Sequence, residues 1–218
     1  LLTALLCLGE GTRAAATDLS RVLRFVREMR RFRPREDDVF VASYPRSGTT
    51  LTQYLAYLLL TGPGATKRLD EVRHISQVTP WFERDLAHGR LDSARLEALP
   101  SPRVFKSHLP YTWLPRGGRY IYVTREPADV AVSYYYLYRD YLGFRGNFDA
   151  FFERFRAGRL QYGSLFKHVA GWRREVGNPK VLFLDFETLT TRREASAKRL
   201  AAFLRIHGPE RISFALQQ

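Results

Sequence analysis

The feature that most constrains this chain is a strand, a glycine-containing turn and a helix in direct succession. Val39–Ser43 is a compact apolar run, typical of a buried parallel strand. The turn at 44–50 contains Gly48, and the apolar stretch Leu51–Leu60 predicts a helix that ends at Gly62–Gly64. Backbone N–H groups converge at such a turn, and the helix adds the positive end of its dipole. The segment therefore predicts an anion-binding loop.

Further strands are predicted by short apolar runs at 103–106, 119–124 and 181–185. Between and around them the sequence predicts helices at 18–32, 51–60, 93–99, 129–138, 148–155, 163–176 and 193–205. Strands that alternate with helices imply a parallel sheet with helices on both faces, so the fold class is α/β. The 218 residues suit one such domain, in which we expect 1–17 to be poorly ordered.

Composition narrows the range of partners. Lysine and arginine number 35 against 22 acidic residues, and the formal net charge of +13 favours a nucleic acid, an acidic membrane or a phosphate-rich small ligand. No aromatic–basic module for nucleic acid accompanies the charge, so we expect no nucleic-acid partner. Cys7 is the only cysteine, which excludes an intramolecular disulfide. The apolar opening Leu1–Leu8 is too short to span a bilayer, so we expect a cytoplasmic protein without stable membrane association.

The turn itself carries groups that suit an anion. Gly48 permits close approach of the backbone, and Arg46 adds a fixed positive charge. The hydroxyl residues of the turn, which can donate hydrogen bonds or cap the helix, are Ser47, Thr49 and Thr50. Taken alone, the segment is also compatible with an ordinary N-capped helix. The pattern G-x-x-x-x-G-K-[ST] of nucleotide triphosphatases is absent, which favours a phosphate ligand without magnesium.

Several blocks of the sequence together resemble the cytosolic sulfotransferases. Tyr44–Leu51 resembles the family's phosphosulfate loop, Y-P-K-S-G-T-T-W, and Lys106–Pro110 is similar to its K-T-H-L-P block. Tyr122–Tyr135 is similar to the block that binds the 3'-phosphate of the donor. Tyr162–Ser164 and the strand at 181–185 follow in the family's order. Several motifs in the same order are far more specific than any one of them.

The resemblance, which covers residues 35–214, implies a P-loop-like sulfotransferase fold and an enzyme. The implied reaction moves a sulfonate group from 3'-phosphoadenylyl sulfate (PAPS) to a hydroxyl or amine of a small acceptor and releases 3',5'-adenosine bisphosphate (PAP), without a metal. A degenerate family member that binds the nucleotide without turnover is the main alternative. A P-loop nucleotide kinase is a more distant one.

The same resemblance assigns catalytic roles to three residues. His108 is the expected base, and a neutral imidazole suits that role near pH 7. Lys106 shares a face with His108, because alternate residues of an extended segment point the same way, and it would hold the transferring group. Arg46 stands where the family's loop has lysine, and its guanidinium can clamp phosphate with two hydrogen bonds.

The donor site follows from the same alignment. Arg125 and Ser133 match the ligands of the 3'-phosphate, and Phe186 matches an aromatic residue near the adenine, although core packing explains Phe186 equally well. The complete predicted donor set is Arg46, Ser47, Gly48, Thr49, Thr50, Arg125, Ser133 and Phe186. Leu51 replaces the tryptophan that stacks on adenine in the family. The family's R-K-G…G-D-W-K block does not follow Phe214, so we expect either a fragment of a longer protein or an incomplete donor site.

An acceptor pocket should be mostly apolar with few polar groups. Aromatic side chains that suit its wall are Trp81, Phe82, Tyr111 and, within the run Tyr134–Tyr136, Tyr135. Packing in the core is an equal alternative for Trp81 and Phe82. Glu83 is a candidate polar group in the pocket. A phenol, steroid, amine, sugar or polyketide hydroxyl all remain open as acceptors.

Overall fold

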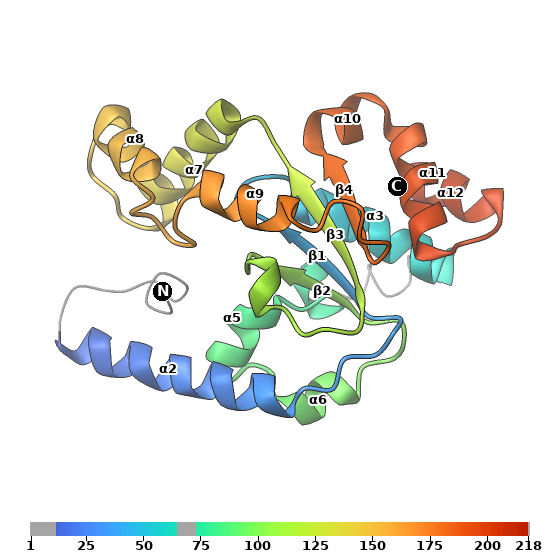
Figure 1. The fold of residues 1–218 in the computed structure, drawn as a ribbon, viewed down its shortest axis with the longest axis horizontal. Coiled ribbons are helices and arrows are strands. Elements are labelled where there is room, and N and C mark those ends of the chain that lie inside the picture. Colours follow the sequence, from blue (N-terminus) through green and yellow to red (C-terminus); the bar gives the residue numbers. More distant parts are fainter. Residues whose placement is uncertain (1–11, 65–72, 218) are drawn as a thin grey trace.

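The computed structural model describes residues 12–64 and 73–217. Its centre is one four-stranded sheet with the strand order β2–β1–β3–β4 (Figure 1). All neighbouring strands run parallel. The strands are β1 (Val39–Ser43), β2 (Val104–Ser107), β3 (Arg119–Thr124) and β4 (Val181–Asp185). The predicted parallel α/β architecture is confirmed.

Helices cover both faces of this sheet. They are α2 (Thr12–Arg31), α3 (Thr49–Thr61), α5 (Phe82–Ala87), α6 (Ser93–Glu97), α7 (Pro127–Tyr141), α8 (Phe148–Arg156), α9 (Leu165–Arg173), α10 (Phe186–Thr191), α11 (Arg193–Leu204) and α12 (Pro209–Gln217). Two short 3₁₀ turns, η1 (Ile75–Gln77) and η2 (Tyr111–Trp113), lie between them. Figure 1 shows α3, α11 and α12 on one side of the sheet and α2, α5 and α6 on the other.

The two faces of β1 explain why the strand is buried along its whole length. Val39 and Val41 point into an aliphatic core that α3, α11 and α12 cover. Phe40 and Ala42 point the other way, into an aromatic core that contains residues of α2, α5, α6 and α9. Successive side chains of a strand alternate between faces, so an apolar run with no polar break is what a sheet covered on both sides requires.

A third apolar cluster stands beside the carboxyl end of β1. Tyr44, the residue after β1, packs edge-on against Tyr134 of α7 and Phe155 of α8. The Tyr44 hydroxyl donates a 2.9 Å hydrogen bond to the carbonyl of Gly163. The cluster fixes α7 and α8 next to the loop that follows β1.

Local signals account for most element boundaries. β1, β3 and β4 have the predicted bounds, and β2 begins at Val104 rather than at 103. Helix α9 begins at Leu165 rather than at 163, because Gly163 has a φ of +72° and the Ser164 hydroxyl caps the helix at the amide of Lys167.

Other boundaries differ from the prediction. Helix α2 begins at Thr12, so 12–17 of the segment expected to be poorly ordered continue this helix, and 1–11 lie outside the described residues. Three helices were not predicted at all: α5, α10 and α12. The first two have six residues each, too few to show a helical period. Within 12–64 and 73–217, no helix combines the length and the apolar character needed to cross a membrane.

Candidate active site

The loop after β1 adopts an unusual backbone. Arg46 has a φ of +70° and Gly48 a φ of +94°, both in the left-handed region. A non-glycine residue there costs on the order of 1–3 kcal/mol and is common at ligand-binding loops. A β-carbon at position 48 would lie 2.3 Å from Cδ2 of Phe186, so glycine is also required by packing. The turn is therefore built around close contact with the phenyl ring of Phe186.

The amino end of α3 is open to a ligand. Gly48 is its N-cap residue, and no side chain caps the helix there. The Thr49 hydroxyl instead lies 2.6 Å from the Ser43 hydroxyl. The alternative interpretation of this segment, an ordinary helix with a side-chain N-cap, is therefore wrong. The free N–H groups and the helix dipole are available to an anion.

Two buried donors near this loop lack partners. Among the described residues, Ser47 Oγ and Arg125 Nε are shielded from solvent and make no hydrogen bond. Leaving a buried donor unsatisfied costs about 1–3 kcal/mol, more for a charged group. Both atoms are satisfied if an anionic ligand accepts from them. The chain's own residues therefore fit the phosphate groups of a nucleotide.

Arg46, Arg125 and Ser133 come together although they lie far apart in the sequence. Arg46 Nε donates a 2.9 Å hydrogen bond to Ser133 Oγ on α7, and Arg125 donates at 3.1 Å to the Arg46 carbonyl. The Arg125 guanidinium also lies 4.6 Å from the ring centre of Phe186. The three polar groups converge because the loop after β1 meets the loop after β3.

These groups border a cavity of about 210 Å³, the first cavity. Its lining consists of Arg46, Gly48, Thr49, Thr50, Leu51, Lys106, His108, Arg125, Ser133 and Phe186. Every predicted donor residue is in this set except Ser47, which is buried beneath the turn. Leu51, at the position of the family's tryptophan, also lines it.

His108 follows β2 directly and is buried. Its Nδ1 lies 2.8 Å from the carbonyl oxygen of Ser43. A carbonyl can only accept, so Nδ1 carries the proton and Nε2 keeps a lone pair. Burial, with the nearby charge of Lys106, holds the pKa of His108 well below its usual value. The imidazole is therefore neutral at pH 7 and oriented to accept a proton at Nε2.

Lys106 lies on the same side of the strand as His108, as the alternation of the sequence predicts. Its ammonium group is 4.1 Å from the ring centre of Trp81. Burial lowers the pKa of Lys106 to about 8, so the group is mainly charged at pH 7. Trp81 is held in place by backbone pairing with Lys106, whose amide donates at 2.9 Å to the Pro80 carbonyl.

A second cavity of about 340 Å³ adjoins the first. Its lining consists of Pro45, Arg46, Trp81, Arg84, His88, Lys106, His108, Tyr134, Leu137, Leu142, Gln161 and Tyr162. Trp81 and Tyr162 both pack against His108, with ring centres 5.1 and 5.2 Å from the imidazole. Arg46, Lys106 and His108 line both cavities. Both cavities contain basic side chains, the second adds the aromatic rings of Trp81, Tyr134 and Tyr162, and the three shared side chains lie between them.

Of the predicted acceptor residues, the structure brings only Trp81 to this cavity. Phe82 is fully buried in the aromatic core, because it begins α5 and its side chain turns inward against Phe40. Tyr111 packs on Trp172. Tyr135 points toward Phe151 of α8. One residue is a rotation of about 100° on a helix, so Tyr134 rather than Tyr135 reaches the cavity.

Some lining residues were not predicted. Arg84 lies in α5 and His88 is its C-cap residue. They were not predicted because α5 itself was not predicted. Gln161 and Tyr162 come from the loop before α9. The sequence contained one indication for Tyr162, because the block Tyr162–Ser164 follows the family's order of motifs.

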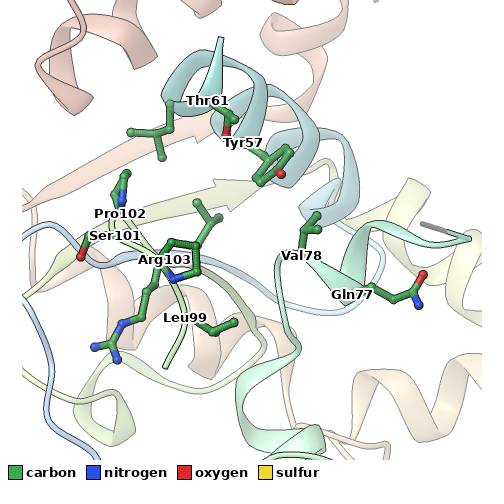
Figure 2. Close-up of a pocket in the computed structure, with 11 residues that line it drawn as sticks. Tyr57, Thr61, Gln77, Val78, Leu99, Ser101, Pro102 and Arg103 are labelled. Atoms are coloured by element: carbon green, nitrogen blue, oxygen red, sulfur yellow. The ribbon is translucent and has the colours of Figure 1, made fainter. Parts of the chain in front are cut away.

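The two cavities that contain the predicted donor residues and His108 lie at the carboxyl edge of the sheet. A larger cavity of about 590 Å³ lies at the opposite end of β2, between Tyr57 and Thr61 of α3, Gln77 and Arg103 (Figure 2). It contains none of the predicted site residues. In the parts of the chain that the structure describes, no three His, Cys, Asp or Glu side chains gather as a metal site would require.

Sequence comparison places the chain among known proteins. Residues 36–216 match the sulfotransferase domain. Human sulfotransferase 1E1 is 35% identical over 165 residues, which cover 72% of this chain and 55% of that protein. Human sulfotransferase 4A1 is 36% identical over 186 residues, with 81% and 63% covered. Luciferin sulfotransferase of Photinus pyralis is 33% identical over 202 residues, with 84% and 55% covered. The chain thus spans less than two thirds of each of these relatives.

Solved structures show the same fold. Mouse sulfotransferase SULT7A1 complexed with PAP superposes with a TM-score of 0.70 at 28% identity, covering 91% of this chain and 69% of that one. Retinol dehydratase in complex with androsterone and the inactive cofactor PAP gives 0.74 at 25% identity, with 89% and 68% covered. Both relatives were solved with the same adenosine bisphosphate.

Proposed function

Because the chain belongs to the sulfotransferase domain family, we propose that it transfers the sulfonate group of PAPS to a hydroxyl or amine of a small acceptor and releases PAP. The observation that carries this proposal is the pair of adjoining cavities that share Arg46, Lys106 and His108. An anion site beside an aromatic pocket, with a neutral base between them, suits group transfer between a nucleotide and a small molecule.

The first cavity is the proposed donor site. The donor supplies a sulfonate group attached to a phosphate. The open amino end of α3, Arg46 and Ser47 Oγ would hold the phosphosulfate end. Arg125 and Ser133 would hold the 3'-phosphate, and Phe186 would contact the adenine. The unpartnered Arg125 Nε supports this assignment, because it is a buried cationic donor without an acceptor.

His108 is the proposed base. The acceptor oxygen forms its bond to sulfur as it gives up its proton to His108 Nε2. The hydrogen bond from Nδ1 to the Ser43 carbonyl fixes the tautomer and the orientation of the ring. The low pKa of His108 keeps the lone pair available well below pH 7.

Lys106 and Arg46 are the proposed charge stabilisers. As the sulfur–oxygen bond to the donor breaks, negative charge develops on the phosphate oxygen. Two cations fixed in a partly water-excluded site stabilise that charge more strongly than water does. Lys106 is well suited, because it lies between the two cavities and is held against Trp81.

The second cavity is the proposed acceptor site. Trp81, Tyr134 and Tyr162 give it an aromatic wall on which a ring can stack. Relatives named for luciferin, and retinol dehydratase in complex with androsterone, support a small acceptor with an apolar ring system.

Calorimetric titration with PAP tests the donor site, with AMP and ATP as controls. We expect micromolar binding of PAP and much weaker binding of both controls. Transfer of labelled sulfonate from PAPS to 4-nitrophenol, with and without a chelator, then tests the reaction. Equal rates in both conditions are expected for a metal-independent enzyme. Failure to bind PAP contradicts the proposal, and tight binding without transfer to any acceptor identifies a degenerate family member.

A further inference from the structure

A buried carboxylate lies behind the second cavity, and the proposed mechanism gives it no role. Glu83 belongs to α5 and is only 2% exposed. It does not line either cavity. The sequence suggested a polar group in the acceptor pocket, but the structure places the carboxylate beneath the pocket wall, against the end of β2.

Four donors from three segments converge on this carboxylate. Its Oε1 accepts from the Trp81 indole at 2.7 Å, from the His108 amide at 2.9 Å and from the Tyr162 hydroxyl at 3.2 Å. Its Oε2 accepts from the Ser107 hydroxyl at 2.9 Å. Trp81 and Tyr162 are the rings that pack against the His108 imidazole. The Glu83 carboxylate therefore binds both of these side chains and the backbone of His108.

The donors suit a carboxylate that accepts on both oxygens. An indole N–H and a backbone amide can only donate, so Oε1 must accept. Ser107 Oγ accepts from the Leu109 amide at 3.0 Å, and its own proton is free to point to Oε2. Burial raises the pKa of Glu83, and these hydrogen bonds oppose that rise.

The opposite side of the His108 peptide is held as firmly. His168 Nε2 lies 3.0 Å from the His108 carbonyl, and the Tyr122 hydroxyl lies 2.8 Å from His168 Nδ1. Since the carbonyl only accepts, Nε2 carries the proton and Nδ1 accepts from Tyr122. Glu83 and His168 thus restrain the amide and the carbonyl of the base from two directions.

We propose that Glu83 is the positioning residue that fixes His108 relative to the acceptor-facing rings of Trp81 and Tyr162. The inference rests on the proposed function, in which His108 takes the acceptor proton. Glu83 touches no substrate and acts through its neighbours. Its charge also favours the protonated form of Lys106, opposing the effect of burial there. Misplacement of a reacting group by 1 Å costs about 10²-fold in rate.

The test is Glu83→Gln, which keeps the size of the side chain and removes its charge. With PAPS and 4-nitrophenol we expect kcat to fall about 10–100-fold and the KM for 4-nitrophenol to rise, because partners of this kind typically contribute that much. The Kd of PAP should change less than about 2-fold, since Glu83 lies outside the first cavity.

Glu28→Gln is the matched control. Glu28 is also 2% exposed, its Oε2 accepts from the amide and hydroxyl of Ser93, and neither residue lines either cavity. We expect it to lower Tm as Glu83→Gln does and to leave kcat and KM unchanged. If Glu83→Gln also changes only Tm, Glu83 is structural and the proposal is overturned.

A second readout does not depend on turnover. Glu83 accepts a hydrogen bond from the backbone amide of His108, so a shift of the His108 imidazole ¹⁵N resonances in Glu83→Gln, absent in Glu28→Gln, reports that the change is transmitted to the ring. Unchanged His108 resonances in Glu83→Gln overturn the proposal for Glu83. Absence of transfer to 4-nitrophenol by the wild type counts against the proposed function alone, because the resonances can be measured without turnover. If Glu83→Gln does not fold, Ser107→Ala removes one donor, and the same shift with a smaller loss of kcat is expected.

Discussion

The chemistry of individual residues at this site depends on burial. His108 is neutral at pH 7 because it is enclosed beside a cation, and Lys106 has a pKa of about 8 for the same reason. In water both side chains would have their ordinary pKa values. The Arg125 guanidinium lies 3.6 Å from the Asp129 carboxylate, and its buried Nε makes no hydrogen bond, so this atom is available to donate to an anionic ligand.

Replacement of His108 by alanine is expected to remove the base and leave the donor site intact. A positioned base contributes about 10²–10⁴-fold, so kcat should fall by that factor while the Kd of PAP is nearly unchanged. His207→Ala, at an exposed histidine, is the control and should have no effect. Turnover retained by His108→Ala would exclude His108 as the base.

Arg125→Ala is expected to weaken PAP selectively. A hydrogen bond to a charged group contributes about 1.5–3 kcal/mol, so the Kd of PAP should rise roughly 10–100-fold. AMP, which lacks the 3'-phosphate, should lose little affinity in the same titration. Arg174→Ala removes an exposed arginine as control. Equal losses for PAP and AMP would contradict the assignment of Arg125 to the 3'-phosphate.

At the scale of elements, the loop between β1 and α3 is the defining feature. Its hydroxyl side chains do not cap the helix, so the amino end of α3 stays available. Its left-handed residues bring the backbone against Phe186, at the start of α10. The loop is therefore held by a contact that spans most of the sequence, and it depends on α10 as much as on its own residues.

Gly48→Ala tests that contact. The new methyl group would meet the Phe186 ring at 2.3 Å and would also occupy a left-handed backbone position. Gly143→Ala is the matched control, because Gly143 has a φ of +72° and nothing within 4 Å of an added β-carbon. The left-handed position alone costs roughly 1–2 kcal/mol. We expect Gly48→Ala to lose more unfolding free energy than the control, and PAP affinity as well. Equal losses would show that Phe186 does not pack on the loop.

At the scale of the whole molecule, strand order assembles the site. β1 lies between β2 and β3, so the loop after β1 has Lys106 and His108 on one side and Arg125 on the other. All strands run parallel, and their carboxyl ends meet at one edge, where α/β proteins bind ligands. The buried histidines at this edge also make the stability of the fold depend on pH.

Acid should destabilise the protein through His108 and His168. Burial lowers the pKa of His168 to about 4 and that of His108 well below its usual value, so the unfolded chain binds more protons than the folded one below about pH 6.5. The unfolding free energy should therefore fall as pH drops from 6.5 toward 5, by up to about 1.4 kcal/mol per pH unit for each histidine.

Urea unfolding at several pH values measures this slope. Glu83 and Asp85, whose pKa values burial raises, act in the opposite sense, so the comparison with a variant is the decisive quantity. His168→Gln should reduce the slope by about 1.4 kcal/mol per pH unit between pH 6 and 5. An identical slope in His168→Gln would contradict the buried, neutral state of His168.

Elements with local signals could be predicted from the amino-acid sequence. The apolar run of β1, the glycine turn and the alternation that places Lys106 and His108 on one side follow from periodicity and backbone preference, which a short segment carries alone. The family resemblance added the expected donor set, and the structure brings nearly all of it to one cavity.

The residues that line the second cavity, and the carboxylate behind them, could not be predicted without the arrangement of the elements in space. Phe82, Tyr111 and Tyr135 are as aromatic as Trp81 and Tyr134, yet they face the core or α8, because the partners that fix their direction lie far away in the sequence. Glu83 is the clearest case. Its four donors come from residues 81, 107, 108 and 162, and no local sequence pattern predicts that these residues meet. The periodicity of a sequence predicts on which face of its helix or strand a side chain lies. Which residues pack against that face depends on the arrangement of the other elements.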